Sequence, residues 1–296
     1  MIDFNAGIEL PNPYTGVDNK SAVLMDNKLY MLKYPTPVRR RNINDVALYK
    51  NNQFSEHIGC EIFRACGFET QETSLGYFTG MEGKEKIVVG CVDFTQDGSK
   101  LYEIARLAKQ IKSSDCMDSI DMVKSRIENV VYIINHSVFL KDKDYFFHRF
   151  WDMFVIDALL GNDDRHLGNW GIVVKDNVFD FAPIYDCGAS LAASMEDGVM
   201  RKYLADDVFF RGEELSVKSC YSMEGKKIRY CDIFDSPPPE LAEAIKRTVP
   251  KIDIGKILNI VDSVTMLSET RNAYIKRALL LRYENILAPA LKKLSE

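Results

Sequence analysis

The sequence has no apolar stretch long enough to cross a membrane and no basic, apolar leader at its start. The longest apolar run, 130–140, is interrupted by Asn135 and His136, whereas a membrane span needs about 18 to 20 apolar residues. The first residues, Met1 to Phe4, lack the positive patch and apolar stretch of a secretion signal. We therefore expect a protein without a membrane span, located in the cytoplasm.

Cysteine motifs for metal binding or redox chemistry are also missing. The seven cysteines are scattered, no pair has the short spacing of a zinc knuckle or a dithiol, and only four histidines accompany them. We expect no structural metal site and interpret the thiols as small apolar side chains in a reducing compartment. The net charge of −5 gives no electrostatic reason for direct nucleic-acid binding. The one basic run, Arg39–Arg41, is interpreted as a solvated loop.

The residues that are present are typical of a folded globular protein. Of the 296 residues, 46% are apolar and 11% aromatic, and these side chains must be buried in a core. The length fits one large or two modest structural units.

The first third of the sequence reads mainly as strands with one helix, and the remainder mainly as helices. The patterns predict strands at 22–25, 29–33, 70–78 and 86–94, a helix at 54–65 that Gly67 ends, helices at 117–134, 145–160 and within 239–292, and a hairpin at 170–182. This organisation predicts an α+β protein with a strand-rich lobe over 1–95 and a helical lobe over 96–296. The cleft between two such lobes is the natural ligand site.

The densest group of functional side chains lies at 161–169 and is followed, after the hairpin, by Tyr185 and Asp186. Phosphoryl transfer from ATP needs a carboxylate at the attacking hydroxyl and oxygen ligands for Mg²⁺. Asp164 and Asn169, five residues apart, can serve one role each, and Asp186 can supply the second metal ligand. The competing interpretation is that aspartate and asparagine form ordinary turns.

Two neighbours of Asp164 complicate this assignment. Asp163 is the rival carboxylate, and Asp164 is preferred because of its spacing from Asn169. His166 is interpreted first as a residue that holds the loop by hydrogen bonding.

The segment Asp164-Arg165-His166-Leu-Gly-Asn169-Trp170, followed by Ala182-Pro183-Ile-Tyr185-Asp186, resembles the catalytic loop and metal-binding segment of HipA-like serine/threonine kinases. These include CtkA-like proteins and share the broader fold of the phosphoinositide lipid kinases. The resemblance implies a two-lobed protein-kinase-like fold with ATP and Mg²⁺ as cofactors. It also implies that Asp164 is the catalytic base or orients the hydroxyl, that Asn169 and Asp186 bind the metal, and that His166 and Tyr185 line the nucleotide site.

Other parts of the kinase site follow from the same resemblance. Lys33, at the end of a predicted strand, matches the lysine that contacts the ATP phosphates, although alone it would be an ordinary surface lysine. Glu56 matches the helix glutamate that orients this lysine. Glu61 is its rival, because it falls beside the apolar face of the same helix.

The resemblance also assigns a short phosphate loop and a segment for adenine. The loop has a glycine and a Lys-Ser end, and its backbone N–H groups would hold phosphate oxygens. Pro13 stands where the HipA toxin has a self-phosphorylated serine, so that self-inactivation is not expected here. The loop comprises Thr15, Gly16, Val17, Asp18, Asn19, Lys20 and Ser21, and the adenine segment comprises Val92, Asp93 and Phe94.

These features lead us to expect an ATP- and Mg²⁺-dependent kinase that phosphorylates serine or threonine, with tyrosine as an alternative, on a protein substrate. Segment 190–221 is in the position of a kinase activation and substrate loop, and Ser194, Ser216 and Ser219 are candidate phosphorylation sites. The resemblance implies a toxin role and an antitoxin partner. The alternatives are a kinase for a lipid or small molecule and a nucleotide-binding pseudokinase.

Overall fold

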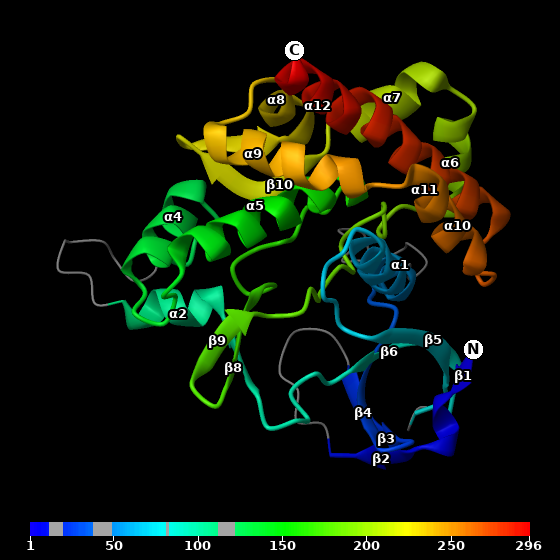
Figure 1. Ribbon diagram of the computed structural model, residues 1–296. Coiled ribbons are helices and arrows are strands. Elements are labelled where there is room, and N and C mark those ends of the chain that lie inside the picture. Colours follow the sequence, from blue (N-terminus) through cyan, green and yellow to red (C-terminus); the bar gives the residue numbers. More distant parts are fainter. Residues whose placement is uncertain (12–19, 38–48, 81–82, 112–121) are drawn as a thin grey trace.

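The computed structural model describes residues 1–11, 20–37, 49–80, 83–111 and 122–296. A curled sheet with one helix forms the smaller, N-terminal lobe, and a mainly helical lobe holds the rest of the chain (Figure 1). The α+β, two-lobed prediction is therefore confirmed. The residues of the predicted phosphate loop from Thr15 to Asn19, together with Pro13 and the run Arg39–Arg41, lie outside the described residues.

The N-terminal lobe is built on a six-stranded sheet in the order β1-β5-β6-β4-β3-β2, in which only the β1–β5 pair is parallel. The predicted hairpin is confirmed: its turn residues Asp26 and Asn27 have φ of 50° and 60°, the backbone that a tight type I′ turn requires. The strands are β1 (Ile2–Asp3), β2 (Ile8–Leu10), β3 (Lys20–Met25), β4 (Lys28–Lys33), β5 (Thr73–Phe78) and β6 (Lys86–Val92).

Helix α1 (Asn52–Ala65) lies between the two lobes. It packs on β5 and β6 of the sheet and on α10 (Ile254–Ser263) of the helical lobe. Its apolar residues Phe54, Ile58 and Ile62 are buried, and Gly67 follows its end with a φ of +87°. The predicted helix and its stop are therefore confirmed.

A three-stranded sheet, β7-β8-β9, joins the helical lobe. Strands β8 (Gly171–Lys175) and β9 (Val178–Phe181) are the predicted hairpin, again turned by two aspartate or asparagine residues with positive φ. Strand β7 (Lys100–Glu103) pairs with β8 and was not predicted, because the sequence pattern indicated helices from about residue 100 up to this hairpin. The four residues of β7 show no local pattern typical of a strand. Their extended backbone is fixed by pairing with β8, about 70 residues later in the chain.

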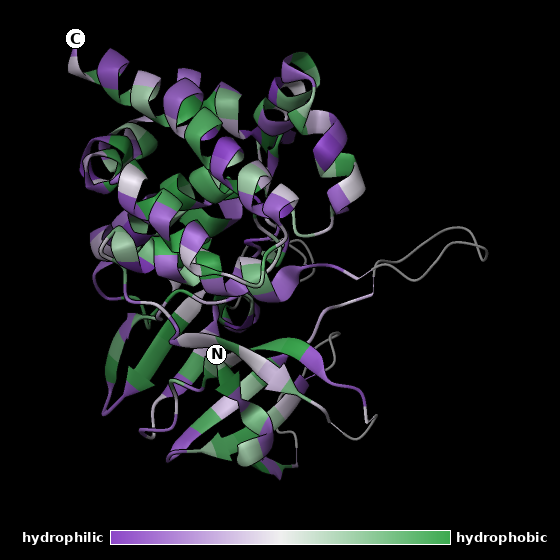
Figure 2. Ribbon diagram, turned by 90° about the vertical axis from the view of Figure 1, so that its right-hand side faces the viewer, coloured by the Kyte–Doolittle hydropathy of each residue, from purple (hydrophilic) through white to green (hydrophobic). Residues whose placement is uncertain are grey.

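The helical lobe is organised around α5 (Lys143–Leu160), whose last eleven residues are all buried. Figure 2 shows apolar residues, in green, along the strands and within the helical lobe, and hydrophilic ones, in purple, on outer helix surfaces. The other helices are α2 (Ile104–Gln110), α4 (Ile127–His136), α6 (Asp197–Leu204), α7 (Asp207–Leu215), α8 (Tyr230–Asp235), α9 (Pro239–Thr248), α11 (Glu269–Arg282) and α12 (Ala288–Ser295), with short helical turns at Phe4–Ala6, Val249–Lys251 and Tyr283–Leu287.

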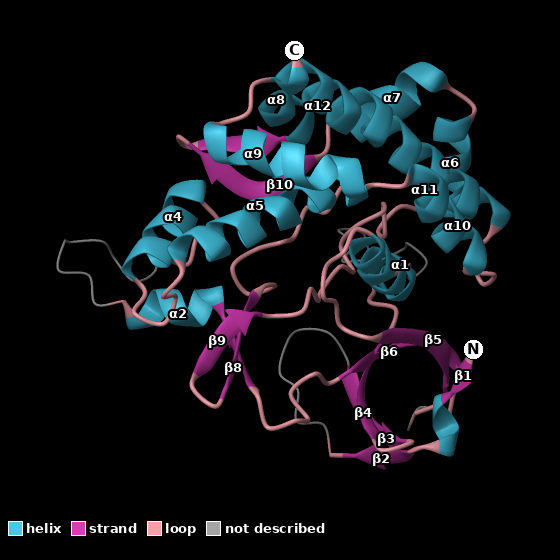
Figure 3. Ribbon diagram, viewed as in Figure 1, coloured by secondary structure: helices cyan, strands magenta, loops and turns pink. Residues whose placement is uncertain are grey.

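Two predictions for this lobe need correction. The sequence predicted one continuous helix at 117–134, but residues 123–126 interrupt it. Arg126 is extended and bridges to Ser222, and α4 begins at Ile127; residues 117–121 lie outside the described part. The segment 190–221 is not one long loop. It holds α6, α7 and much of β10 (Lys218–Met223), which pairs with β11 (Lys226–Arg229), as Figure 3 shows. Among the described residues, no helix has both the length and the apolar character that crossing a membrane requires.

Candidate active site

The loop that carries Asp164 begins where α5 ends. Gly161 takes a left-handed backbone, with φ 64° and ψ 41°, and its N–H donates to the carbonyl of Asp157. Within the loop, the Asp164 N–H donates to Asn162 Oδ1 at 3.0 Å, and Asn169 Nδ2 donates to the Asp164 carbonyl at 2.8 Å. These bonds fix the loop backbone, while the Asp164 side chain is partly open to solvent and partly enclosed by the surrounding protein.

His166 also supports this loop. Its Nδ1 accepts from the N–H of Gly168 at 3.0 Å, so the proton of a neutral ring sits on Nε2. Its backbone carbonyl accepts from the Asn169 N–H at 2.9 Å. His166 lines the cavity described below while holding the turn, in agreement with the loop-holding interpretation.

Arg165 ties the loop to the segment that contains Tyr185 and Asp186. Its guanidinium is buried and forms a two-point ion pair with Asp157, Nε to Oδ2 at 3.0 Å and Nη2 to Oδ1 at 3.1 Å. Nη1 donates to the carbonyls of Asn169, at 3.0 Å, and Tyr185. The sequence motif contained Arg165, but this role could not be read from it, because Asp157 lies on the preceding helix.

Asp186 is held in the cavity by an unusual backbone conformation. Its φ of 57° is in the left-handed region, which is rare for a residue with a side chain and marks a constrained position. Two residues earlier, Ile184 exchanges backbone hydrogen bonds with Glu69 and Gln71 of the N-terminal lobe, both at 2.8 Å. The Asp186 N–H donates to Glu56 Oε1 at 3.0 Å.

Lys33 joins the two lobes electrostatically. Its Nζ lies 3.0 Å from Glu56 Oε1 and 3.1 Å from Asp186 Oδ1. Burial alone would lower the pKa of Lys33, but the two carboxylates outweigh burial and raise this pKa well above its usual value. The rival Glu61 instead pairs with Arg64 on the outer side of α1, so the structure brings Glu56 to the lysine.

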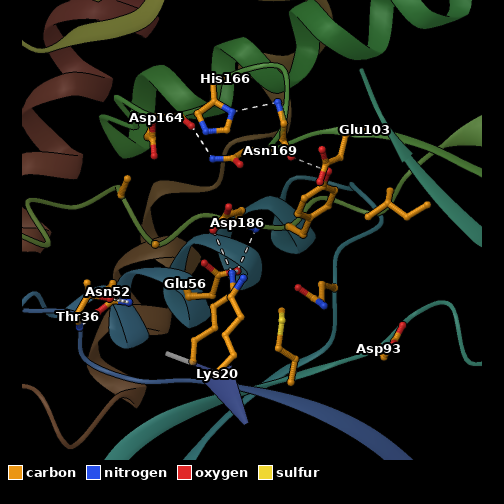
Figure 4. A pocket seen from close by; sticks show the side chains of 18 of the residues that line it. Lys20, Thr36, Asn52, Glu56, Asp93, Glu103, Asp164, His166, Asn169 and Asp186 are labelled. Atoms are coloured by element: carbon orange, nitrogen blue, oxygen red, sulfur yellow. Dashed lines mark hydrogen bonds and ion pairs between the residues drawn. The ribbon is translucent and has the colours of Figure 1, made fainter. Parts of the chain in front are cut away.

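A cavity of about 670 Å³ lies between the lobes and collects most of these side chains. Figure 4 looks into it. Its lining includes lysines, carboxylates and amides, and also the side chains of Met31, Phe94, Leu101 and Tyr185. Of the predicted site residues, those lining it are Lys20, Lys33, Glu56, Asp93, Phe94, Asp164, His166, Asn169, Tyr185 and Asp186.

Two predicted residues do not line this cavity. Ser21 points its hydroxyl at Glu9 and Tyr34. The backbone of Val92 is already used, since its N–H donates to the Glu72 carbonyl at 2.8 Å and its carbonyl accepts from Gln71 Nε2 at 3.0 Å. In the adenine segment, Asp93 and Phe94 therefore reach the cavity and Val92 does not.

Gln71 is a lining residue that the sequence did not reveal. Because its Nε2 faces the carbonyl of Val92, its Oε1 is fixed on the opposite side, where it has no hydrogen-bond partner among the residues the structure describes. A buried acceptor without a donor costs about 1–3 kcal/mol. A ligand that donates a hydrogen bond at this position would remove that cost.

The pKa values of Asp164 and Asp186 are shifted in opposite directions. Burial raises the pKa of Asp164 and the charge of Asp186 adds to the rise, whereas the imidazole of His166, when protonated, opposes it. Burial also opposes ionisation of Asp186, but the ammonium of Lys33 dominates and lowers the pKa of Asp186. One group is thus suited to accept a proton and the other to remain an anion.

A second cavity, of about 810 Å³, opens on the far side of Asp164. It shares Asp164, Lys50 and Ala189 with the first cavity and runs along α6 and α7. The exposed Ser194 lines it, whereas Ser219 is buried and Ser216 lies outside it at the end of α7. The loop at Asp164 therefore borders both cavities.

The chain is similar to known proteins in both sequence and structure. Residues 14–252 match the family model of the HipA-like C-terminal domain. The serine/threonine-protein kinase CtkA of Helicobacter pylori (strain J99 / ATCC 700824) is 33% identical over 271 residues, which cover 88% of this chain and 78% of that protein.

Two solved structures share the fold. The crystal structure of a Helicobacter pylori proinflammatory kinase CtkA matches with a TM-score of 0.87 and 30% identity, over 99% of this chain and 98% of that one. The Shewanella oneidensis MR-1 toxin–antitoxin complex of HipA, HipB and operator DNA contains a chain that matches with a TM-score of 0.56 and 12% identity, over 90% of this chain and 60% of that one.

Proposed function

The chain belongs to the HipA-like family of serine/threonine kinases, and from this premise we propose that it uses ATP and Mg²⁺ to phosphorylate a serine or threonine of a protein. The observation that carries the proposal is the convergence of Lys33, Asp164, Asn169 and Asp186 on one cavity. Electrostatic positioning provides most of the acceleration in phosphoryl transfer, and these four residues supply the charges and oxygens it needs.

The cavity suits a nucleotide. Met31, Phe94, Leu101 and Tyr185 in its lining offer apolar contacts for a purine base, and the ring centroids of Phe94 and Tyr185 lie 6.0 Å apart. The unpaired Oε1 of Gln71 accepts hydrogen bonds, so it fits the exocyclic amine of adenine and disfavours the carbonyl of guanine. The lysine ammonium can bind phosphate oxygens.

The donor set suits Mg²⁺. No cluster of three or more His, Cys, Asp or Glu side chains suited to a metal occurs among the described residues. Asp186 offers a carboxylate and Asn169 an amide oxygen, because the Asn169 nitrogen already donates to the loop backbone. Mg²⁺ commonly takes one or two carboxylates and completes its shell with water and phosphate. Bound there, Mg²⁺ would neutralise phosphate charge.

Each protein group then has a defined task. The Asp164 carboxylate orients the acceptor hydroxyl and takes its proton, for which its raised pKa is favourable. Lys33, held by Glu56, binds the phosphate oxygens, and Asn169 and Asp186 hold the metal. The cavity beyond Asp164 gives the acceptor side chain a route to the transferred group.

Phosphate transfer from radiolabelled ATP to protein, lipid and metabolite pools tests this function. Asp164→Asn and Asp186→Asn should each lower transfer by about 10³-fold or more. Asp163→Asn, the neighbouring carboxylate, should retain activity within about tenfold of wild type. Near wild-type transfer by Asp164→Asn would refute the mechanism. Transfer to lipid alone would show that the substrate is a lipid and not a protein. Binding of ATP without any transfer would indicate a pseudokinase.

We extend the proposal to a toxin role with an antitoxin partner, as the complex of the Shewanella HipA with HipB suggests. Expression of the wild type should slow growth of a bacterial host, and Asp164→Asn should not. Equal growth of the two strains would argue against the toxin role.

A further inference from the structure

Lys50 occupies the junction between the two cavities. It precedes α1, and its backbone N–H donates to the carbonyl of Thr36 at 2.8 Å. The next residue, Asn51, donates its N–H to the carbonyl of Ala193 at 2.8 Å. The base of the Lys50 side chain is thus fixed to both lobes, and the side chain lines the nucleotide cavity and the cavity beyond Asp164.

The charge of Lys50 is available to a ligand. The half-buried side chain forms no ion pair within 4.0 Å among the described residues, and its positive charge acts on the carboxylates of Asp163 and Asp164. Lys33, by contrast, is held between two carboxylates. Of the positively charged residues, only Lys50 borders both cavities as the structure describes them.

The other cations near the site are placed for different tasks. Lys20 lies opposite Lys33 in the β3–β4 register and lines the nucleotide cavity but not the second cavity. Arg282 lines the second cavity, but its guanidinium is buried against Glu214 and the Leu159 carbonyl. Each of these residues lines only one of the two cavities, so neither is placed to contact the phosphoryl group in both.

We propose that Lys50 is a catalytic residue whose ammonium contacts the phosphoryl oxygens as the group passes from nucleotide to acceptor. The inference rests on the proposed function. In that step, the bond between the γ-phosphorus and the β,γ-bridging oxygen breaks, and a bond forms to the acceptor hydroxyl oxygen. The hydroxyl proton moves to Asp164, the bridging electrons stay on ADP, and Lys50 remains protonated. A fixed cation there stabilises transition-state charge.

Steady-state kinetics of Lys50→Ala, Lys50→Arg and a matched control, Lys246→Ala, test this role. Lys246 is an exposed lysine on α9 that pairs with Glu243. Lys50→Ala should lower kcat by about 10²-fold, the usual effect of losing one transition-state donor. The KM for ATP and the Kd for ADP should change less than about threefold, because the ground-state phosphates rest on other groups. Lys50→Arg should recover at least about tenfold of the loss.

The pH profile gives a readout that a purely structural role would not move. The carboxylate of Asp164 is surrounded by the charges of His166, Asp186, Lys50 and Arg165. Loss of the Lys50 charge raises the pKa of Asp164 further, so the acidic limb of kcat should shift to higher pH in Lys50→Ala. It should return toward the wild-type position in Lys50→Arg.

Parallel assays of Asp164→Asn separate the possible failures. If wild type and Asp164→Asn show the same background transfer, the proposed function itself fails. If Asp164→Asn is inactive and Lys50→Ala has wild-type kcat and pH profile, only the role of Lys50 is refuted. Loss of ADP binding in Lys50→Ala would also overturn this role, because it would place the lysine in ground-state binding.

Discussion

The buried pair of Asp157 and Arg165 should control both the stability of the helical lobe and the geometry of the active site. Both side chains are almost fully buried, and two hydrogen bonds join them at 3.0 and 3.1 Å. Burial raises the pKa of Asp157, and only the neighbouring guanidinium opposes this rise strongly. The buried negative charge of Asp157 and the buried positive charge of Arg165 therefore depend on each other for stabilisation.

Asp157→Asn keeps the side-chain shape and leaves the Arg165 cation buried without a counter-charge. Breaking a buried ion pair in this way costs about 3–5 kcal/mol of the free energy of unfolding. Urea unfolding followed by tryptophan fluorescence measures this cost, because Trp151 and Trp170 are both buried in the same lobe. A change below about 1 kcal/mol, as for an exposed ion pair, would refute the reasoning.

A double variant separates charge compensation from positioning. Arg165→Met combined with Asp157→Asn removes both charges, so its destabilisation should be smaller than the sum of the single variants by about 1–3 kcal/mol. Its activity should remain about 10²-fold low, because the carbonyls of Asn169 and Tyr185 lose the guanidinium that aligns them. Recovery of activity together with stability would show that Arg165 does not position the loop.

Three further outcomes are expected. Glu56→Gln should lower kcat/KM by about 10²-fold through loss of the lysine's partner, whereas Glu61→Gln, on the outer face of the same helix, should stay within about twofold in the same assay. Gly161→Ala should lower the free energy of unfolding by about 2 kcal/mol or more, because the backbone of Gly161 is left-handed and a Cβ would lie 2.4 Å from the guanidinium carbon of the buried Arg282. Gly67 is also left-handed but has open space around it, so Gly67→Ala should lower the free energy of unfolding by only about 1 kcal/mol. Because burial raises the pKa of Asp164, kcat should fall as the pH drops through a value above the usual carboxylate pKa of about 3.9, and an acidic limb at or below that value would contradict the assignment.

The sequence was most informative where local chemistry decides the structure. Asp-Asn pairs such as Asp26–Asn27 tolerate the positive φ that a tight hairpin turn requires, so the first two hairpins could be placed within a residue or two. Strand β7 and the hairpin of β10 and β11 were missed. Strand β7 pairs with a distant partner, and β10 is irregular in register. The turn Glu224–Gly225, with φ of 51° and 75°, was the available signal for the β10–β11 hairpin.

The active-site residues also divide into those that the sequence reveals and those that it does not. The residues proposed to carry the chemistry, such as Asp164 and Asp186, stand in short segments whose order identifies them. Other residues of the site come from elsewhere in the chain: Asp157 from the preceding helix, Gln71 from the loop before β5, and Lys50 from just before α1. Their roles depend on three-dimensional contacts, and no spacing in one sequence reveals those contacts.

Helix α1 connects these contributions and makes the proposed nucleotide and metal sites depend on one element. From its first turns, Asn52 Nδ2 donates to the carbonyl of Tyr34, just after Lys33, while Glu56 bonds both Lys33 and the N–H of Asp186. One turn further, a Cβ on Gly59 would lie 2.6 Å from Cys187 Cβ, so the helix backbone lies directly against the segment that follows Asp186. A displacement of α1 would therefore disturb Lys33 and Asp186 together. The packing of α1 on both the sheet and α10 opposes such a displacement (Figure 1).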